Sequence, residues 1–384
     1  MVIAIDIRLL GKKRTGDEMV FRYLTRELVK LEHEAKLLLL TDETNPDQIR
    51  AVQKELGTEG RANVEIISLP ASNRYSWNLF AVPGFLRSRK VDVFHTQYIL
   101  PFFVPKRTRL FVHIHDISFK VFPEMIGWKD RIFLALLIPR SMRIADRILT
   151  PSEFTKAEII RRYRVAEERI VVIPNAAGDE FLSQASEADI MRVREKYALP
   201  EKFVLAVGTM QPRKNIAFLV KAFAEASKRI PDLALVLVGK RFGYRYDLEI
   251  EHAIDELPLP EKVIFPGYVD DADMPALYAG ARAFAFPSHY EGFGIPILEA
   301  LSQDTPIVAS DIPPSREVAG SSARFFDRSS VASAAEMLYN VIIDENLRSQ
   351  LSAQGKDRVR FFSWEKSARL LRNLFRERCL EDRA

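Results

Sequence analysis

The chain has 384 residues, which is more than one ordinary hydrophobic core organises, so its length predicts two domains. Hydrophobic residues make up 47% of it and charged residues 28%, a globular balance that excludes a disordered or fibrous chain. The single cysteine, Cys379, excludes an internal disulfide and a cysteine-based zinc site, and this scarcity favours a reducing, cytoplasmic compartment.

The first residues, MVIAIDIRLL, lack a basic stretch ahead of the apolar run, so they indicate a strand rather than a signal peptide. The apolar run at residues 132–138 is far too short to span a bilayer. Charge is uneven: residues 1–178 hold 29 Lys+Arg and 21 Asp+Glu, net +8, and the remainder holds 56 − 29 = 27 and 52 − 21 = 31, net −4. This asymmetry indicates an anionic partner for the first half, or is a common imbalance without function.

Short apolar strands and amphipathic helices alternate along the first half. Strands are predicted over residues 2–7, 37–40, 64–67, 91–94, 109–114, 148–150 and 170–173. A basic loop at residues 11–18 precedes the first of the helices, which are predicted over residues 19–31, 46–56, 76–89 (interrupted at 83–84), 128–145 and 154–163, the last capped by Ser152. This alternation predicts a parallel sheet covered on both faces, and the break at residues 174–178 predicts a domain boundary.

The pattern restarts after a connecting segment with one helix at residues 188–197. Strands are predicted over residues 203–207, 233–238, 263–265, 283–286 and 307–309, with a helix at 216–229 capped by Asn215. A last amphipathic helix is predicted at residues 364–380. The sequence therefore predicts two α/β domains in tandem.

The helix at residues 128–145 has two interpretations. Its apolar residues Trp128, Ile132 and Leu136 share one side, and cations are mixed among them. A basic amphipathic helix of this kind lies on membrane surfaces, but more often it packs inside a protein with cations extending to water. We favour the packed helix.

Ligands bind beyond the carboxyl ends of strands in open parallel sheets, so the residues that follow strands are candidates for the site. In the first domain these are Gly16, His95, His115 and Asp116. In the second they are residues 208–214, 239–241 and 287–294. Together they supply an Arg-Lys pair, glycines and carboxylates, a combination that suits a sugar diphosphate.

The stretch FPSHYEGFGIPILEA at residues 286–300 carries most of this chemistry. Gly292 and Gly294 allow the backbone to approach a ligand, and Pro296 fits the first turn of a helix whose free N–H groups favour a phosphate. Glu291 and Glu299 are placed so that both can face one ligand. The alternative is a strand, loop and helix with two solvated glutamates.

Other residues are weighed in the same way. Arg213 and Lys214 can neutralise a diphosphate leaving group, or form a solvated turn. His115 can donate to a sugar hydroxyl, or is a structural histidine. No dinucleotide or P-loop glycine motif occurs, and Asp273 of the Asp-Ala-Asp sequence is better interpreted as a helix cap than as a metal ligand.

Residues 291–299, EGFGIPILE, resemble the E-x7-E element of the retaining glycosyltransferases of family 4, the group 1 nucleotide-sugar transferases with the GT-B fold. Similar segments follow the family's order along nearly the whole chain. They are HDISF at 115–119, PSEFT at 151–155, IPN at 173–175, GT at 208–209, PRKN at 212–215 and TPIVAS at 305–310.

The resemblance implies two facing Rossmann-like domains. Residues 1–178 with the helix at 363–384 form the acceptor-side domain, and residues 179–362 form the donor-binding domain. The catalytic group implied is His115, Arg213, Lys214 and Glu291. The donor-binding group implied is Gly16, Gly208, Thr209, Gly239, Gly292, Phe293, Gly294, Ile295 and Glu299. Among these, Glu299 is expected to bind the ribose hydroxyls and Glu291 the sugar hydroxyls. One departure is Glu18, which stands near where the family often has a second glycine.

The implied activity is transfer of a hexose from a nucleotide-diphosphate sugar to an acceptor hydroxyl, with retained configuration, in glycan, lipopolysaccharide or glycolipid synthesis. GDP-mannose is favoured as donor because the PRKN loop resembles that of mannosyltransferases, and UDP-glucose and UDP-N-acetylglucosamine remain open. Neither a metal nor another cofactor is expected. A nucleotide-sugar epimerase and a non-catalytic binding subunit are the alternatives. A lipid-linked acceptor would bring the basic first half to a membrane, and no nucleic acid is expected.

Overall fold

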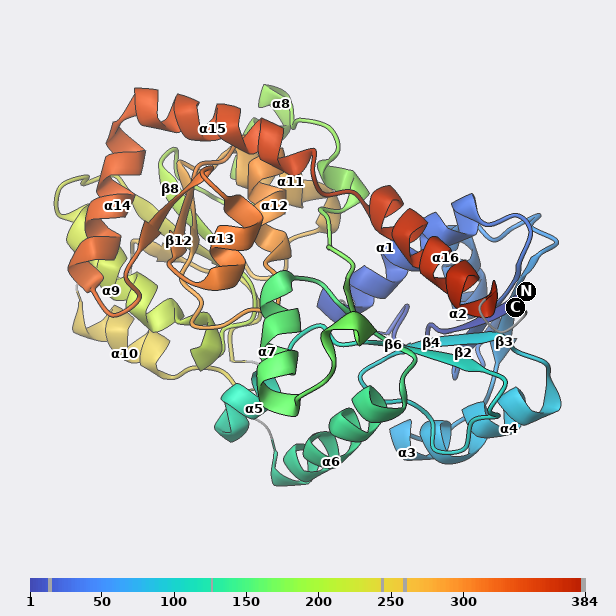
Figure 1. The fold of residues 1–384 in the computed structure, drawn as a ribbon. Helices are drawn as coiled ribbons and strands as arrows, with labels where there is room; N and C mark the ends of the chain where they lie inside the picture. The colour runs from blue at the N-terminus through green and yellow to red at the C-terminus, as the bar shows by residue number, and fades with distance from the viewer. Residues whose placement is uncertain (13–15, 126, 243–244, 258–260, 381–384) are drawn as a thin grey trace. The chain divides into compact units, whose positions relative to one another are not determined.

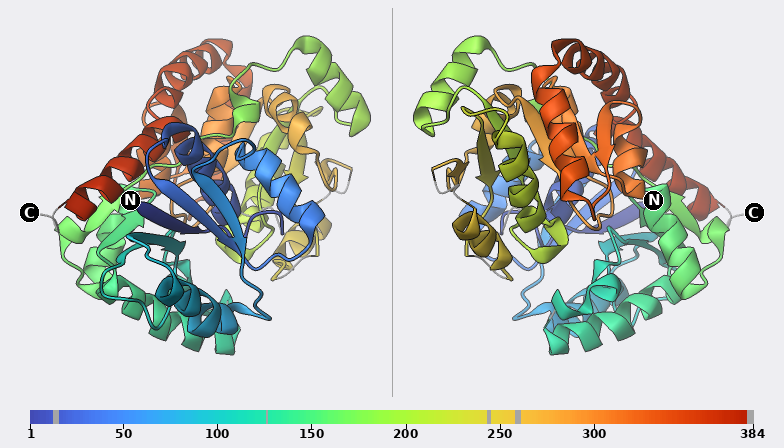
Figure 2. Two further views of the ribbon diagram at one scale, coloured as in Figure 1. Left: turned by 90° about the vertical axis from the view of Figure 1, so that its right-hand side faces the viewer. Right: turned by 90° about the vertical axis from the view of Figure 1, so that its left-hand side faces the viewer.

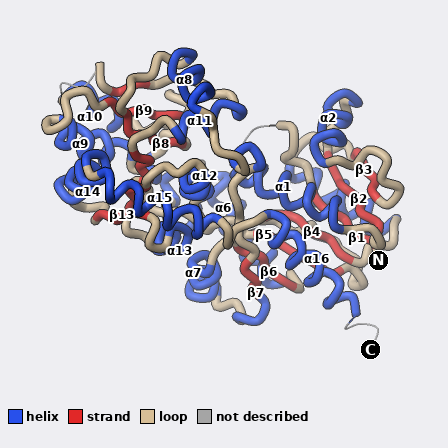
Figure 3. The backbone as a smooth tube through the Cα atoms, turned by 90° about the horizontal axis from the view of Figure 1, so that it is seen from above, coloured by secondary structure: helices blue, strands red, loops and turns tan. Residues whose placement is uncertain are grey.

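The computed structural model describes residues 1–12, 16–125, 127–242, 245–257 and 261–380. The chain divides into two compact units, Met1–Asn175 with Ser363–Ala384, and Ala176–Phe362. The boundary predicted after residue 178 lies a few residues further along the chain, and residues 13–15 of the predicted basic loop fall outside the described ranges. Each unit is a parallel sheet flanked by helices, as Figure 1 and Figure 3 show.

The first unit contains a sheet whose described strands are all parallel, in the order β3-β2-β1-β4-β5-β6-β7. The strands are β1 (Val2–Asp6), β2 (Lys36–Thr41), β3 (Val64–Ser68), β4 (Val93–Gln97), β5 (Arg109–His113), β6 (Arg147–Thr150) and β7 (Ile170–Val172). Helices cover both faces, which is why a strand such as β2 carries four consecutive buried leucines rather than alternating apolar and polar residues. β4 continues to Gln97, so the prediction that His95 ends this strand is wrong, and His95 lies buried within it.

Helices lie on both faces of this sheet (Figure 1). One layer contains α1 (Gly16–Leu31), α2 (Pro46–Leu56) and α16 (Trp364–Leu380), and the other contains α3 (Arg74–Ser76), α4 (Val82–Ser88) and α6 (Trp128–Ile144). α16 packs along α1, where the rings of Tyr23 and Trp364 stack with centroids 5.5 Å apart. The C-terminal helix therefore belongs to the core of the first unit.

Local signals account for most helix boundaries in this unit. Ser152 caps α7 (Glu153–Tyr163), accepting a hydrogen bond from the N–H of Thr155 at 3.0 Å, as predicted. The short helix α5 (Ser118–Val121) follows β5. The interruption predicted at Pro83 and Gly84 is wrong, because Pro83 lies in the first turn of α4, where its missing N–H is not needed. The irregularity lies earlier, in a π-helical turn at Trp77–Ala81.

The second unit has a parallel sheet in the order β10-β9-β8-β11-β12-β13. Its strands are β8 (Phe203–Val207), β9 (Ala234–Val238), β10 (Val263–Ile264), β11 (Ala283–Phe286), β12 (Ile307–Ser310) and β13 (Ala323–Phe326). One apolar layer is formed with α9 (Ile216–Ser227), α10 (Glu249–Glu256) and α14 (Val331–Ile343), of which α9 and α14 lie side by side (Figure 2). The other is formed with α8 (Glu187–Lys196), α11 (Met274–Ala279), α12 (Ile295–Ser302) and α13 (Pro313–Ala319). α15 (Glu345–Val359) packs against α12.

Two predicted helix caps in this unit are wrong. Asn215 precedes α9 in the left-handed conformation with φ 58°, and its side-chain amide donates to the carbonyl of Pro287 at 3.2 Å. Asp273 makes no cap bond, and its carboxylate instead accepts hydrogen bonds from Arg192 at 2.8 Å and Lys196 at 2.7 Å. Burial raises the pKa of Asp273, but these cations more than offset it and lower the pKa to about 2.

No helix in the described ranges is long and apolar enough to cross a membrane.

Candidate active site

The order of the strands in the second sheet reverses at its centre, between β8 and β11. β8 and β11 are neighbours, and the connections from β8 lead to β9 on one side while β11 leads to β12 on the other. At such a switch point the loops after the two strands separate and leave a place for a ligand. Here those loops are residues 208–215 and 287–294, the two segments that the sequence predicts as the site.

Two glycines allow the backbone at this edge to come close. Gly239 follows β9 with φ 157°, and a Cβ placed there would lie 2.0 Å from the carbonyl oxygen of Gly208. Gly208 follows β8 with φ 147°, and its missing Cβ would lie 3.8 Å from the Nζ of Lys214. The side chain of Lys214 therefore folds back toward Gly208 at the end of β8, and Thr209 is the next residue of this loop.

The loop after β8 and the loop after β11 are joined through the carboxylate of Glu291. Arg213 Nη1 donates to Glu291 Oε2 at 2.9 Å, and Lys214 Nζ donates to Oε1 at 2.6 Å. Arg213 also donates to the carbonyl of Tyr290 at 2.9 Å, and the hydroxyl of Ser288 donates to Glu291 Oε1 at 2.6 Å. We call Arg213, Lys214, Ser288 and Glu291 the charged cluster.

Glu291 is ionised in this cluster. Its side chain is buried, and burial alone raises the pKa of a carboxyl group. The nearby charges of Lys214 and Arg213 act in the opposite direction and lower the pKa of Glu291 to about 2. The carboxylate therefore holds two cations in place at the switch point, and the three charges sum to +1.

The amino end of α12 faces the same loop. Gly294 precedes the helix with φ 123°, which favours glycine, and Pro296 lies in the first turn. Neither Gly292 nor Gly294 carries a side chain that would exclude a ligand from the backbone. Phe293 points into the core, where its ring meets that of Phe362 with centroids 5.7 Å apart. Gly292, Phe293 and Gly294 can therefore offer a ligand little besides their backbone, whereas the side chain of Ile295 is only half-buried.

Glu299 lies further along α12 and is also buried. Its Oε2 accepts a hydrogen bond of 2.7 Å from the hydroxyl of Tyr278, which is fully buried in α11. Sequence reasoning missed Tyr278, because no local signal connects a tyrosine on one helix to a glutamate on the next. It also missed Ser288, although its spacing of three residues from Glu291 was a usable signal.

The first unit supplies His115 and Gly16 at the carboxyl edge of its own sheet. The Nε2 atom of His115 lies 2.9 Å from Gln97 Oε1, and its ring stacks on that of His113 with centroids 4.5 Å apart. His115 is buried, and its Nδ1 has no hydrogen-bond partner among the described residues. Gly16 begins α1 and is exposed.

The structure also shows the surroundings of Glu18 and of two buried histidines in the first unit. Glu18, the departure from the family pattern, is buried and pairs with Arg22 at 2.7 Å. Burial lowers the pKa of His95 to about 3 and the pKa of His113 well below its ordinary value, so both rings are neutral. Across the described ranges, no group of three or more His, Cys, Asp or Glu side chains is arranged to hold a metal ion.

Solved structures share this fold along almost the whole chain. Sucrose-phosphate synthase from Thermosynechococcus elongatus has a TM-score of 0.75 at 21% identity, covering 98% of both chains. The Anabaena protein HepE, solved with UDP and glucose, has a TM-score of 0.75 at 19% identity, covering 98% of this chain and 100% of its own. Two Rossmann-like units with parallel sheets give this protein the GT-B fold.

The family follows from the sequence comparison. The family described as glycosyl transferases group 1 matches residues 189–358, and the one described as glycosyltransferase family 4 matches residues 15–180. O-antigen chain mannosyltransferase B of Escherichia coli is 34% identical over 287 residues, which is 73% of each chain. The chain belongs to the group 1 glycosyltransferases, and the resemblance and hexosyltransferase class predicted from the sequence are confirmed.

Proposed function

We propose that this protein transfers mannose from GDP-mannose to a hydroxyl group of a glycan or lipid-linked acceptor, with retention of the anomeric configuration. The observation that carries the proposal is the charged cluster, because it presents two cations at the switch point of the donor-side sheet. The choice of mannose is supported by the similarity to an O-antigen chain mannosyltransferase of Escherichia coli.

In this reaction the bond between the anomeric carbon and the diphosphate oxygen breaks, and a bond from that carbon to the acceptor oxygen forms. The acceptor proton passes to the departing phosphate oxygen, so no protein carboxylate is the nucleophile. Negative charge grows on the diphosphate as the bond breaks, and Arg213 and Lys214 stabilise it there. We assign this role to the two side chains and the amino end of α12 rather than to a metal ion.

Glu291 has two functions in this proposal. It holds Arg213 and Lys214 in place before the donor binds, which removes the cost of ordering two long side chains during the reaction. It is also available to accept hydrogen bonds from sugar hydroxyls. Glu299, oriented by Tyr278, accepts from the ribose hydroxyls.

The acceptor is proposed to bind the first unit, in a pocket of about 130 Å³. The pocket lies beyond β1 and β4, the switch point of the first sheet, and is lined by Asp6, Arg8, Leu9, Arg74, Asn78, Gln97, Tyr98, Ile99 and Leu134. This mixture of polar groups and apolar surface suits a sugar ring, which has hydroxyls at its edge and C–H groups on its faces. Gln97 joins the pocket to His115 through the 2.9 Å contact of their side chains.

A panel of sugar nucleotides tests the donor. GDP-mannose is expected to raise the melting temperature more than UDP-glucose, UDP-N-acetylglucosamine or an ADP-sugar, because a ligand at 100 times its Kd stabilises a protein by about 2.7 kcal/mol. Mass spectrometry of an O-antigen-type acceptor is expected to show one added hexose, with activity retained in EDTA. A UDP-sugar as the stabilising donor would overturn the choice of mannose, and formation of an epimer from donor alone would overturn transfer.

A further inference from the structure

The outward face of α6 is apolar. Trp128, Ile132 and Leu136 follow one another at four-residue intervals and are 69%, 53% and 67% exposed. Four-residue spacing places the three side chains in one stripe along the helix. The packed-helix interpretation favoured from the sequence is therefore wrong for this face, which we call the α6 face. A row of exposed apolar side chains along one helix, rimmed by polar residues, is a candidate interaction surface.

The opposite side of α6 is firmly held. Ile138 and Met142 are buried in the core, and the buried hydroxyl of Ser141 accepts a hydrogen bond from the N–H of Leu100 at 2.9 Å. Arg140 donates to the carbonyls of residues 100–102 at 3.0 to 3.2 Å. These contacts fix the rotation of α6 about its axis, so the α6 face points away from the core of the unit.

Further exposed aromatic side chains lie beside the helix. The loop held by Arg140 is also tied to the π-helical turn before α4, since the N–H of Phe102 donates to the carbonyl of Asn78 at 3.1 Å. Phe80 in that turn and Phe103 in the loop are 72% and 55% exposed. α3, α4 and α6 form one layer below the sheet in Figure 1, and the turn that contains Phe80 joins α3 to α4.

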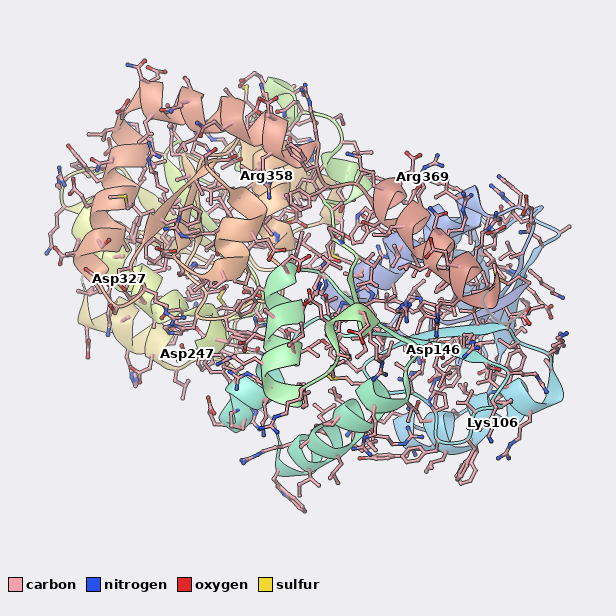
Figure 4. All side chains as sticks on the ribbon, viewed as in Figure 1. Lys106, Asp146, Asp247, Asp327, Arg358 and Arg369 are labelled. Carbon is pink, nitrogen blue, oxygen red and sulfur yellow. The ribbon has the colours of Figure 1, made fainter. Side chains whose placement is uncertain are left out.

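Positive charge is concentrated in the same segment. Residues 71–145 contain 12 Lys+Arg and 4 Asp+Glu, a net of 12 − 4 = +8. The rest of residues 1–178 contains 29 − 12 = 17 Lys+Arg and 21 − 4 = 17 Asp+Glu, which cancel. The whole excess charge of the first half therefore comes from this segment. Arg87, Lys106 and Arg131 are among its exposed cations, and Figure 4 shows Lys106 projecting near α4.

We propose that the α6 face docks onto the surface of an anionic lipid bilayer, with Trp128, Ile132 and Leu136 in the headgroup region. An interfacial helix combines an apolar stripe containing tryptophan with flanking cations, and both are present here. The Arg87 guanidinium lies 5.5 Å from the ring centroid of Phe103, so a cation and an aromatic side chain already meet at this surface. This inference gives the lipid-linked acceptor of the proposed function a location, and it is tested without substrate.

Trp128 provides a direct readout. The chain has three tryptophans, and the other two, Trp77 and Trp364, are buried. Mixing the full-length protein with vesicles of phosphatidylcholine and phosphatidylglycerol is expected to shift the fluorescence of Trp128 to shorter wavelength. Vesicles of phosphatidylcholine alone are expected to leave it unchanged at the same salt concentration. An unchanged spectrum with anionic vesicles, or equal shifts with both kinds, would overturn the proposal.

Variants separate apolar from electrostatic contributions in vesicle co-sedimentation. The triple variant Trp128→Ser, Ile132→Ser, Leu136→Ser is expected to bind at least about tenfold more weakly. Its matched control changes three exposed apolar residues of the second unit, Leu182→Ser, Met191→Ser and Tyr268→Ser, and is expected to bind normally. Equal losses in both variants, with unchanged melting temperatures, would contradict a docking face on α6.

Charge is tested with Arg87→Gln, Lys106→Gln, Arg131→Gln, for which a loss on the order of 100-fold in affinity for anionic vesicles is expected. Its control, Lys221→Gln, Lys228→Gln, Arg360→Gln, removes the same charge from exposed positions of the second unit. Unaltered binding of the first variant would refute an electrostatic contribution. Sedimentation without lipid tests whether a second copy of this chain covers the α6 face instead. A dimer that the serine triple variant dissociates would make this face a protein interface. Transfer to a water-soluble acceptor is measured separately, so docking and catalysis succeed or fail independently.

Discussion

The ammonium group of Lys214 lies 2.6 Å from Oε1 of Glu291, although the two residues are 77 positions apart in the chain. Their contact joins the loops that follow two neighbouring strands, and it fixes a cation where the proposed diphosphate loses its sugar. The pair contributes to both stability and function. The Glu291 carboxylate compensates the charge of Lys214 in the folded protein, and it also holds that cation in the position that the proposed reaction needs.

Replacing Lys214 by alanine is expected to lower kcat by about 100- to 1,000-fold, because the charge developing on the leaving group loses a positioned partner. Glu291 keeps its bond to Arg213 in this variant, so the melting temperature is expected to change little. Steady-state transfer assays measure the effect, with Lys221→Ala on the exposed side of α9 as control. Turnover near the wild-type value would remove Lys214 from the mechanism.

Replacing Glu291 by glutamine is expected to destabilise the protein, because two partly buried cations lose their counter-charge. The change in the pKa of Glu291 from its ordinary 4.5 to about 2 corresponds to roughly 3 kcal/mol. Urea unfolding of the wild type, the variant and the exposed control Glu249→Gln at neutral pH measures this difference.

The pH dependence of that difference has a definite sign. A carboxylate whose pKa is lowered by folding stabilises the protein above its unfolded pKa, and this stabilisation disappears as pH falls toward the folded value. The stability gap between wild type and Glu291→Gln is therefore expected to be constant above about pH 5 and to close between pH 4.5 and 2. A gap that widens in acid would contradict the assigned charge state.

Replacing Gly239 by alanine is expected to cost about 2–4 kcal/mol, because the added Cβ would lie 2.0 Å from a backbone carbonyl that no rotamer change moves. Gly60→Ala is the matched control: its φ is also positive, at 72°, but nothing lies within 4 Å of the added carbon. Its cost is expected to be only about 1 kcal/mol. Equal unfolding midpoints for the two variants would show that the close approach of Gly239 to Gly208 does not constrain the fold.

Removing the hydroxyl of Tyr278 by replacement with phenylalanine is expected to raise the KM for the donor about tenfold with little change in kcat, because Tyr278 positions Glu299 and touches no reacting atom. A double-mutant cycle with Glu299→Gln tests the connection. The second replacement is expected to add little to the first. Fully additive effects would mean that Tyr278 acts through another group, and Tyr339→Phe on α14 is the control.

Replacing Arg8 by glutamine is expected to raise the KM for the acceptor about tenfold and leave the KM for the donor unchanged, because Arg8 lines the pocket of the first unit. Arg50→Gln, on the exposed surface of α2, serves as the control. A higher donor KM with an unaltered acceptor KM would place the acceptor elsewhere.

Residues 286–300 show how much the sequence determined by itself. The end of a buried strand, two glycines and a proline are local signals, and the structure places β11, the loop and α12 where those signals predict them. The approach of Gly239 to Gly208 agrees with the same reasoning, because a glycine after a strand is a backbone requirement. The membership in the group 1 glycosyltransferases was also readable, since its motifs keep their order along the chain.

The tertiary structure alone decided what the side chains touch. Asn215 and Asp273 had the local pattern of helix caps, yet each is bonded to a segment distant in the sequence. Tyr278 and Glu299 meet because α11 and α12 are neighbours, and the stripe on α6 remains exposed because no other described helix of its own unit covers it. Backbone conformation responds to nearby residues, whereas side-chain partners depend on strand order and helix packing, which no short stretch of sequence contains.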